Sequence, residues 1–240
     1  MPSEKISKNV VLLYKKLLSQ GLGIEDIQVL SAKNVGECGS DHLNNLLQKV
    51  ANKNYMRTKS MTMSDISYYQ GDLVIQTINN YKAEIAEGYP QSKPNEIYID
   101  SKTGKEVTFI ANGETGIVDT VNDSSMVINF DGMYVRYNKN QLKMIKLGYC
   151  ISIHRSQGGQ FDYLIVCTPQ SHTFMLNNNL IYTGLTRMKK KCYHLGTVQT
   201  INIAVKKKAN LIRRTFTADL LKEGISNGKD KTKQETKEEQ

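Results

Sequence analysis

Patterns typical of helices and strands alternate at both ends of this chain, whereas the segment between the ends carries only strand-like patterns. Residues 4–20 repeat apolar side chains at helical spacing, and residues 26–31 form a short apolar run. A second helical stripe follows Asp41, a residue type that caps helices, and the alternation returns at about residue 147. Because the strands of a parallel sheet are connected by helices, this arrangement predicts an α/β fold with a parallel sheet.

The middle segment, residues 79–145, is expected to form a small β-barrel, because its strands are short and its turns lie close together. Asp131-Gly132 separates two apolar runs and is a dipeptide typical of two-residue hairpin turns. Residues 101–104 are expected to form another hairpin loop. A helix over residues 81–87 is the one alternative to a strand in this segment.

The two end segments are each too short to hold a separate hydrophobic core. One α/β domain interrupted by the barrel therefore explains the pattern more simply than two α/β pieces and a barrel in a row. Residues 226–240 contain no apolar side chain and are expected to form a disordered tail. The predicted organisation is a discontinuous α/β domain from residues 1–78 and 146–225, with the barrel at 79–145 inserted into it.

The charge balance favours a polyanionic partner. The chain has 32 lysines and arginines against 23 acidic residues, a net charge of +9 that would attract nucleic acid. An ordinary solvated basic surface would have the same balance. No apolar run approaches the roughly 20 residues that span a bilayer, so no membrane contact is expected. The four cysteines are widely spaced and fit no zinc pattern, which indicates a reducing, cytoplasmic compartment and no metal site.

A polar loop with paired glycines lies between two predicted strands, at residues 152–161. Such loops bind ligands at the carboxyl edge of open α/β sheets. Gly158-Gly159 would let backbone N–H groups approach a phosphate, and several side chains would donate to a phosphodiester. These donors are Ser152, His154, Arg155 and Ser156.

A second segment, residues 177–188, is predicted to be a helix that places Thr183, Gly184 and Arg187 on one face. An arginine that projects beyond a closely packed helix face could contact a γ-phosphate. The same arginine could instead pair with an acid or cap carbonyl groups.

These two segments resemble motifs of one family. Residues 148–161, GYCISIHRSQGGQF, resemble motif V of RecD-like superfamily 1 helicases, which include the exodeoxyribonuclease V alpha subunit. Residues 179–190, NLIYTGLTRMKK, resemble motif VI of the same helicases. Three earlier segments resemble the family in the same order, at residues 26–48, 71–81 (GDLVIQTINNY) and 112–116 (NGETG).

The resemblance implies the C-terminal half of a helicase, namely the second RecA-like motor domain with an inserted SH3-like barrel. The family couples hydrolysis of ATP, with Mg²⁺, to 5′→3′ translocation on single-stranded DNA. The 240 residues contain no G-x-x-x-x-G-K-[ST] sequence, so a first motor domain is expected to hold the phosphates and Mg²⁺. The chain alone is therefore expected to bind no cofactor and to hydrolyse no ATP.

The resemblance also implies roles for individual residues. Arg187 would be the arginine finger of motif VI, and Gln157 and Gly158 would face the same nucleotide. Gln160 stands where the family usually has glutamate. An uncharged amide would therefore accept the hydrogen bond from the ribose hydroxyl there. Three residues would contact single-stranded DNA, namely Ser152, His154 and Arg155.

Two functional hypotheses follow from these observations. The first is a helicase motor half that works with a first RecA-like motor domain and, in some complexes, with RecBC-like subunits. Roles in DNA repair, conjugation or a phage are all compatible with it. The second is a nucleic-acid-binding or regulatory module that keeps the fold without ATP dependence, which the substitution at Gln160 motivates. A nuclease has little support, because no cluster of Asp, Glu and His has metal-ligand spacing.

Overall fold

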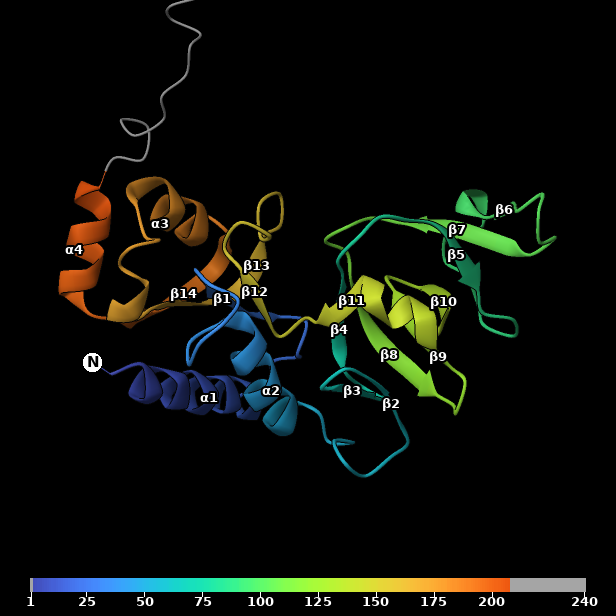
Figure 1. The fold of residues 1–240 in the computed structure, drawn as a ribbon, viewed down its shortest axis with the longest axis horizontal. Helices are drawn as coiled ribbons and strands as arrows, with labels where there is room; N and C mark the ends of the chain where they lie inside the picture. The colour runs from blue at the N-terminus through green and yellow to red at the C-terminus, as the bar shows by residue number, and fades with distance from the viewer. Residues whose placement is uncertain (1, 208–240) are drawn as a thin grey trace, which may run out of the picture.

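The structure, a computed structural model, describes residues 2–207 (Figure 1). The predicted tail at 226–240 and the end of the predicted α/β segment 146–225 lie outside the described residues. Within 2–207, no helix is both long enough and apolar enough to cross a membrane.

A four-stranded parallel sheet forms the first part of the molecule. Its strand order is β12 (Cys150–Ser152), β1 (Ile27–Ser31), β13 (Phe161–Thr168) and β14 (Met188–Gly196). In Figure 1, α1 (Ser3–Ser19) and α2 (Ser40–Ala51) lie on one side of this sheet, and α3 (Asn178–Leu185) and α4 (Val198–Lys206) lie on the other. The predicted α/β fold with a parallel sheet is confirmed.

Alternating side chains of the central strands supply the two cores of this layered structure. Val29 of β1 and Ile165 of β13 pack into the core that α1 and α2 share. Their chain neighbours Leu30 and Val166 pack into the opposite core, under α3 and α4. Because both faces of the sheet are covered, β13 carries an uninterrupted apolar run from Tyr163 to Cys167.

The second part of the molecule is an eight-stranded antiparallel sheet, which lies beside the parallel sheet in Figure 1. Its order is β11 (Ile145–Leu147), β4 (Leu73–Gln76), β8 (Thr115–Val121), β9 (Ser125–Phe130), β10 (Met133–Asn138), β5 (Asn80–Ile85), β7 (Glu106–Ile110) and β6 (Tyr98–Ile99). A separate hairpin pairs β2 (Ser60–Met63) with β3 (Ile66–Tyr69). Three 3-10 turns complete the described elements, at Pro94–Glu96, Lys139–Met144 and Gln170–His172.

The antiparallel sheet extends beyond the predicted insertion at both ends, because β4 begins at Leu73 and β11 ends at Leu147. The domain boundaries at 78 and 146, and an SH3-like closure of this sheet, stay predictions. The Asp131-Gly132 turn joins β9 to β10 as expected. Both of its residues have positive φ, 49° and 83°, which is the conformation of a type I′ turn.

The structure decides against two local interpretations, the alternative of a helix over residues 81–87 and a helix cap at Asp41. Residues 81–87 do not form a helix, because β5 pairs with β7 on one side and β10 on the other. That pairing buries Ala83 and Ile85 at strand spacing and overrides the helical propensity of the segment. Asp41 does not cap α2, whose cap residue is Gly39, and it instead lies in the first turn of the helix and pairs with Lys146 at 3.3 Å.

One buried carboxylate connects the two parts of the molecule. Asp72, directly before β4, accepts hydrogen bonds from Gln48 of α2 at 2.6 Å and from Asn52, the C-cap residue of α2, at 2.7 Å. It also accepts from the Tyr149 hydroxyl at 2.9 Å and from the Tyr69 backbone N–H at 2.8 Å. Burial raises the pKa of Asp72, and these four hydrogen bonds oppose that rise. The carboxylate thus joins α2, β3, β4 and the start of β12.

Candidate nucleotide and nucleic-acid site

The polar loop at residues 152–161 follows β12 and is shaped by its own hydrogen bonds. It is called the phosphate-binding loop, after its predicted role. The buried Ser156 donates from its hydroxyl to the carbonyl oxygen of Ile153 at 2.7 Å, and its N–H donates to that of Ser152 at 3.1 Å. Gly158 has a φ of +88°, which favours glycine at this position. The resulting turn leaves the side chains on either side of Ser156 exposed, at His154, Arg155, Gln157 and Gln160.

The helix predicted over residues 177–188 is shorter in the structure, and Arg187 lies outside it, because α3 ends at Leu185 and β14 begins at Met188. Its guanidinium donates to the carbonyl oxygen of Thr183 at 3.2 Å and to that of Gly159 at 3.3 Å. Its own carbonyl oxygen accepts from the N–H of Phe161 at 2.8 Å. The half-buried arginine therefore holds the phosphate-binding loop against the end of α3.

The guanidinium has carbonyl partners and no acidic one among the ion pairs of residues 2–207. Of the two structural alternatives for Arg187, capping of carbonyls is observed and pairing with an acid is not. Carbonyl groups leave the full positive charge of the side chain uncompensated, so an anionic group can still be attracted to it.

A cleft of about 560 Å³ separates the phosphate-binding loop from the antiparallel sheet. Arg155 and the residues from Gln157 to Gln160 line one wall. Phe109, Asn112 and Lys93 belong to the other wall, which the sequence did not predict as part of a site. The NGETG segment at 112–116 could have indicated this wall, because it resembles a signature of the family. No role was assigned to that segment from the sequence.

A second cleft, of about 50 Å³, brings Ser152 and Arg155 together at the end of β12. Its other polar lining residues are Asn34, Ser40, Asp41, Asn44 and Lys146, and the last pairs with Asp41 at 3.3 Å. Asn44 fixes this arrangement, because its amide exchanges two hydrogen bonds of 2.8 Å with the backbone of Cys150. Since Asp41 is paired with Lys146, the guanidinium of Arg155 and the neutral donors around it suit a phosphodiester oxygen.

The predicted site residues are thus only partly brought together. Arg155 lies in the wall of both clefts, between Ser152 in the smaller one and the group Gln157, Gly158 and Gln160 in the larger one. Arg187 lines neither cleft and contacts the loop from the side of α3. His154 is exposed and also lines neither cleft.

Comparison with known proteins places this loop in a family. Residues 147–194, which include the loop and Arg187, match the UvrD-like helicase C-terminal domain. The ATP-dependent RecD2 DNA helicase of Deinococcus radiodurans is 28% identical over 198 residues, which cover 82% of this chain and 23% of that protein. This chain corresponds to the C-terminal region of a RecD-like superfamily 1 helicase. The RecD subunit of the RecBCD enzyme of Mycolicibacterium smegmatis is 22% identical over 78% of this RecD-like chain and 28% of the subunit.

Solved structures with a similar arrangement include two of Bacteroides Pif1. Pif1 bound to single-stranded DNA has a TM-score of 0.48 and 15% identity, over 84% of this RecD-like chain and 46% of that chain. Pif1 with ADP-AlF3 and single-stranded DNA has a TM-score of 0.44 and 13% identity, over 95% of this chain and 54% of that chain. The RecD-like chain spans only about a quarter of the length of the curated relatives described above.

Gly184 of α3 offers a test of local packing in the segment that resembles motif VI. A Cβ atom there would lie 3.6–3.7 Å from the side chain of Ile153, which is ordinary contact. Gly184→Ala should therefore stabilise the protein by about 1 kcal/mol, through helix propensity and added burial, and raise the midpoint of thermal unfolding by about 2–4 °C. Gly158→Ala is the matched control and should lower the midpoint, because its φ is +88°. A lower midpoint for Gly184→Ala would contradict this packing.

Proposed function

We propose that this chain is the second motor domain of an ATP-dependent 5′→3′ DNA helicase. It acts with a first motor domain that holds the phosphates and Mg²⁺. Arg187 carries the proposal, because its guanidinium has no acidic partner among residues 2–207 and is held by carbonyl groups of motifs V and VI. ATP hydrolysis by a longer protein that contains this sequence, with and without Arg187, tests the proposal.

Nucleotide contact is assigned to Arg187 together with Gln157, Gly158 and Gln160 of the phosphate-binding loop. The hydrogen bond from Arg187 to Gly159 links the two groups, so movement of the loop would move the arginine. Gln160 is exposed and can offer its amide oxygen to a ribose hydroxyl. Mg²⁺ is assigned to the first motor domain, because the 240 residues contain no G-x-x-x-x-G-K-[ST] sequence to supply its Ser/Thr ligand.

Contact with single-stranded DNA is assigned to Ser152, His154 and Arg155. The smaller cleft supports this assignment, because Ser152 and Arg155 line it together with the side chains of Asn34 and Asn44. His154 is exposed beside them and can reach the same strand. RecBC-like subunits remain proposed partners, by analogy with the RecD relatives.

Arg155 gives the sharpest test of the DNA assignment. Arg155→Ala should weaken binding of a single-stranded oligonucleotide severalfold and reduce the slope of log affinity against log salt by about 0.7, the value for one lost phosphate contact. Fluorescence anisotropy at several salt concentrations measures both quantities. Arg57→Ala removes the same charge from an exposed position outside both clefts and should leave the slope nearly unchanged. Equal slopes for Arg155→Ala and the unmodified chain would contradict the assignment.

The competing function is a nucleic-acid-binding module without ATP dependence, and the uncharged Gln160 is the observation in its favour. It predicts tight DNA binding that ATP does not alter in any longer protein. Gln160→Glu restores the residue that the family usually has. If the motor proposal is correct, this substitution should maintain or increase ATP hydrolysis by the longer protein.

A further inference from the structure

A β-bulge in β5 exposes two consecutive side chains of the antiparallel sheet. The pairing of β5 with β7 shifts register between Asn80 and Ala83. Side chains alternate between faces in a regular strand, but here Tyr81 and Lys82 are both exposed. Bulges of this kind reorient side chains and are frequent beside functional sites.

Two contacts fix the side chain of Tyr81, one at the face of its ring and one at its hydroxyl. It stacks on Phe109 of β7, with ring centroids 5.0 Å apart and an angle of 27° between the ring planes. Its hydroxyl oxygen accepts a hydrogen bond from the Asn79 amide at 3.1 Å, and Asn79 in turn accepts from the N–H of Asn112 at 2.8 Å. Despite this order, 63% of Tyr81 and 42% of Phe109 are exposed.

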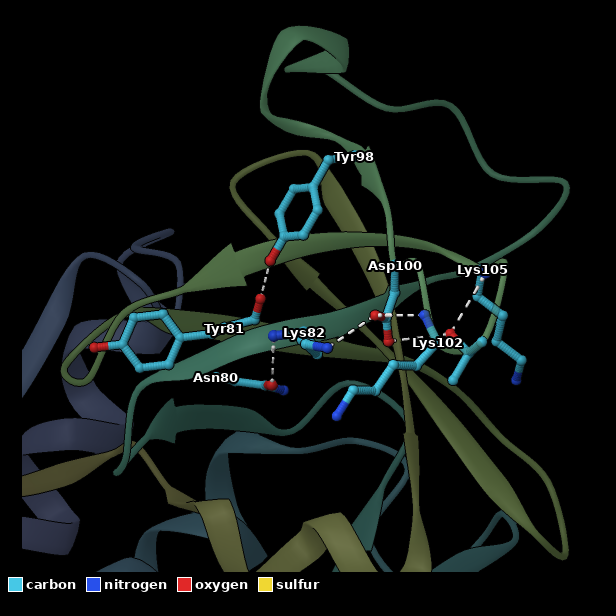
Figure 2. Close-up of polar contacts among 8 residues, drawn as sticks. Asn80, Tyr81, Lys82, Tyr98, Asp100, Lys102 and Lys105 are labelled. Atoms are coloured by element: carbon cyan, nitrogen blue, oxygen red, sulfur yellow. Dashed lines mark hydrogen bonds and ion pairs between the residues drawn. The ribbon is translucent and has the colours of Figure 1, made fainter.

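The backbone of the bulge is braced from β6, the edge strand on the far side of β7 (Figure 2). The Tyr98 hydroxyl donates to the carbonyl oxygen of Tyr81, and the Lys82 ammonium pairs with Asp100 at 2.8 Å. Asp100 also accepts from the backbone N–H of Lys102 at 3.3 Å, which fixes the turn after β6. The exposed ring pair is therefore preorganised.

The ring pair is continuous with the larger cleft. Phe109 and Asn112 line that cleft, opposite Arg155 and Gln157 of the phosphate-binding loop. Arg155 also reaches the smaller cleft, to which the DNA phosphate contact is assigned. A strand bound at Ser152 and Arg155 could therefore continue across the cleft to Tyr81 and Phe109.

The charges around the ring pair favour recognition of bases over recognition of phosphates. Lys82 pairs with Asp100 at 2.8 Å, Lys105 with Glu84 at 2.8 Å and Lys93 with Asp131 at 3.3 Å. Glu96 and Glu114 also line the cleft. Paired lysines beside free acids attract phosphates poorly, whereas exposed aromatic faces stack on any unpaired base.

We propose that Tyr81 and Phe109 form a stacking platform for the unpaired bases of single-stranded nucleic acid. This inference rests on the proposed function, because it extends the strand held at Ser152 and Arg155. Double-stranded DNA does not fit the platform, since its base faces are already stacked.

The test compares three fluorescein-labelled probes on the full 240-residue chain: a dT oligonucleotide of about 12 nucleotides, an abasic oligomer of equal length and a duplex. Tyr81→Ala and Phe109→Ala should each weaken binding of the dT probe between about fivefold and a hundredfold. They should leave binding of the abasic probe and the salt slope unchanged. Tyr81→Phe should retain most of the affinity.

Tyr89→Ala is the matched control, because Tyr89 belongs to another stacked pair, with Tyr134 at 4.9 Å, outside the cleft. It should leave affinity unchanged, and a loss equal to that of Tyr81→Ala would overturn the platform. The platform would also be overturned if Arg155→Ala weakened binding while Tyr81→Ala and removal of the bases did not. Failure of the unmodified chain to bind any probe would overturn the proposed function itself.

Discussion

Arg187→Ala should lower the rate of ATP hydrolysis by a complete helicase containing this chain by about three orders of magnitude. The reason is that a guanidinium compensates the charge that develops on the transferred phosphoryl group. The neighbouring loop carries one other full positive charge, that of Arg155, and Arg155 faces the clefts instead. The measurement is kcat at saturating ATP and single-stranded DNA. Arg187→Lys should recover only a small part of the loss, because lysine lacks the planar fork of donors.

The structural role of Arg187 must be separated from this catalytic role. Its hydrogen bonds to Thr183 and Gly159 hold the loop, so removal of the side chain could also disturb DNA binding. Affinity for single-stranded DNA and the midpoint of thermal unfolding serve as controls for Arg187→Ala. A large loss of kcat with both controls nearly unchanged supports the finger, whereas unchanged kcat would contradict it.

Asp72→Ala should destabilise the folded chain by about 3 kcal/mol or more. The substitution removes the acceptor of four hydrogen bonds, which come from Gln48, Asn52, Tyr69 and Tyr149. The amides of Gln48 and Asn52 keep their second bonds, to the carbonyl oxygens of Ser67 and Gln70, but each loses the acceptor of its other N–H. These donors lie where α2 meets the antiparallel sheet, so the connection between the two parts of the molecule should weaken as well. Urea denaturation followed by circular dichroism measures the free energy of unfolding.

Asp123→Ala is the matched control for Asp72. The Asp123 side chain is 87% exposed and pairs only with the exposed Lys59, so its loss should change the free energy of unfolding by less than about 0.5 kcal/mol. Asp72→Asn keeps the volume of the side chain but replaces one acceptor by a donor, and it should fall between the two. An effect of Asp72→Ala as small as that of Asp123→Ala would contradict the role of this carboxylate.

The sequence predicted those features that depend on regular hydrophobic periodicity. Local patterns of apolar and turn residues predicted the strand around Val29, the helices before and after it in the sequence, and the Asp131-Gly132 turn. The strand β5, Asn80–Ile85, was not predictable in the same way. Its lysine, alanine and glutamate favour a helix, and only pairing with β7 and β10, distant in sequence, decides for a strand.

The candidate site was predictable in its residue types and less so in its geometry. The resemblance identified the loop and Arg187, but local pattern extended the helix of motif VI past Leu185. Parallel pairing with β13 instead draws the chain from Met188 onward into β14. The second wall of the larger cleft, with Phe109 and Asn112, depends on how the two sheets meet, and no local pattern contains that information.

The most direct test of the central proposal is ATP hydrolysis with and without single-stranded DNA, measured on this chain alone and on a longer protein that contains it. A motor half predicts no hydrolysis by the chain alone and DNA-stimulated hydrolysis by the longer protein, which Arg187→Ala abolishes. DNA binding that ignores ATP, without hydrolysis in any longer protein, would contradict the proposal and favour the binding module.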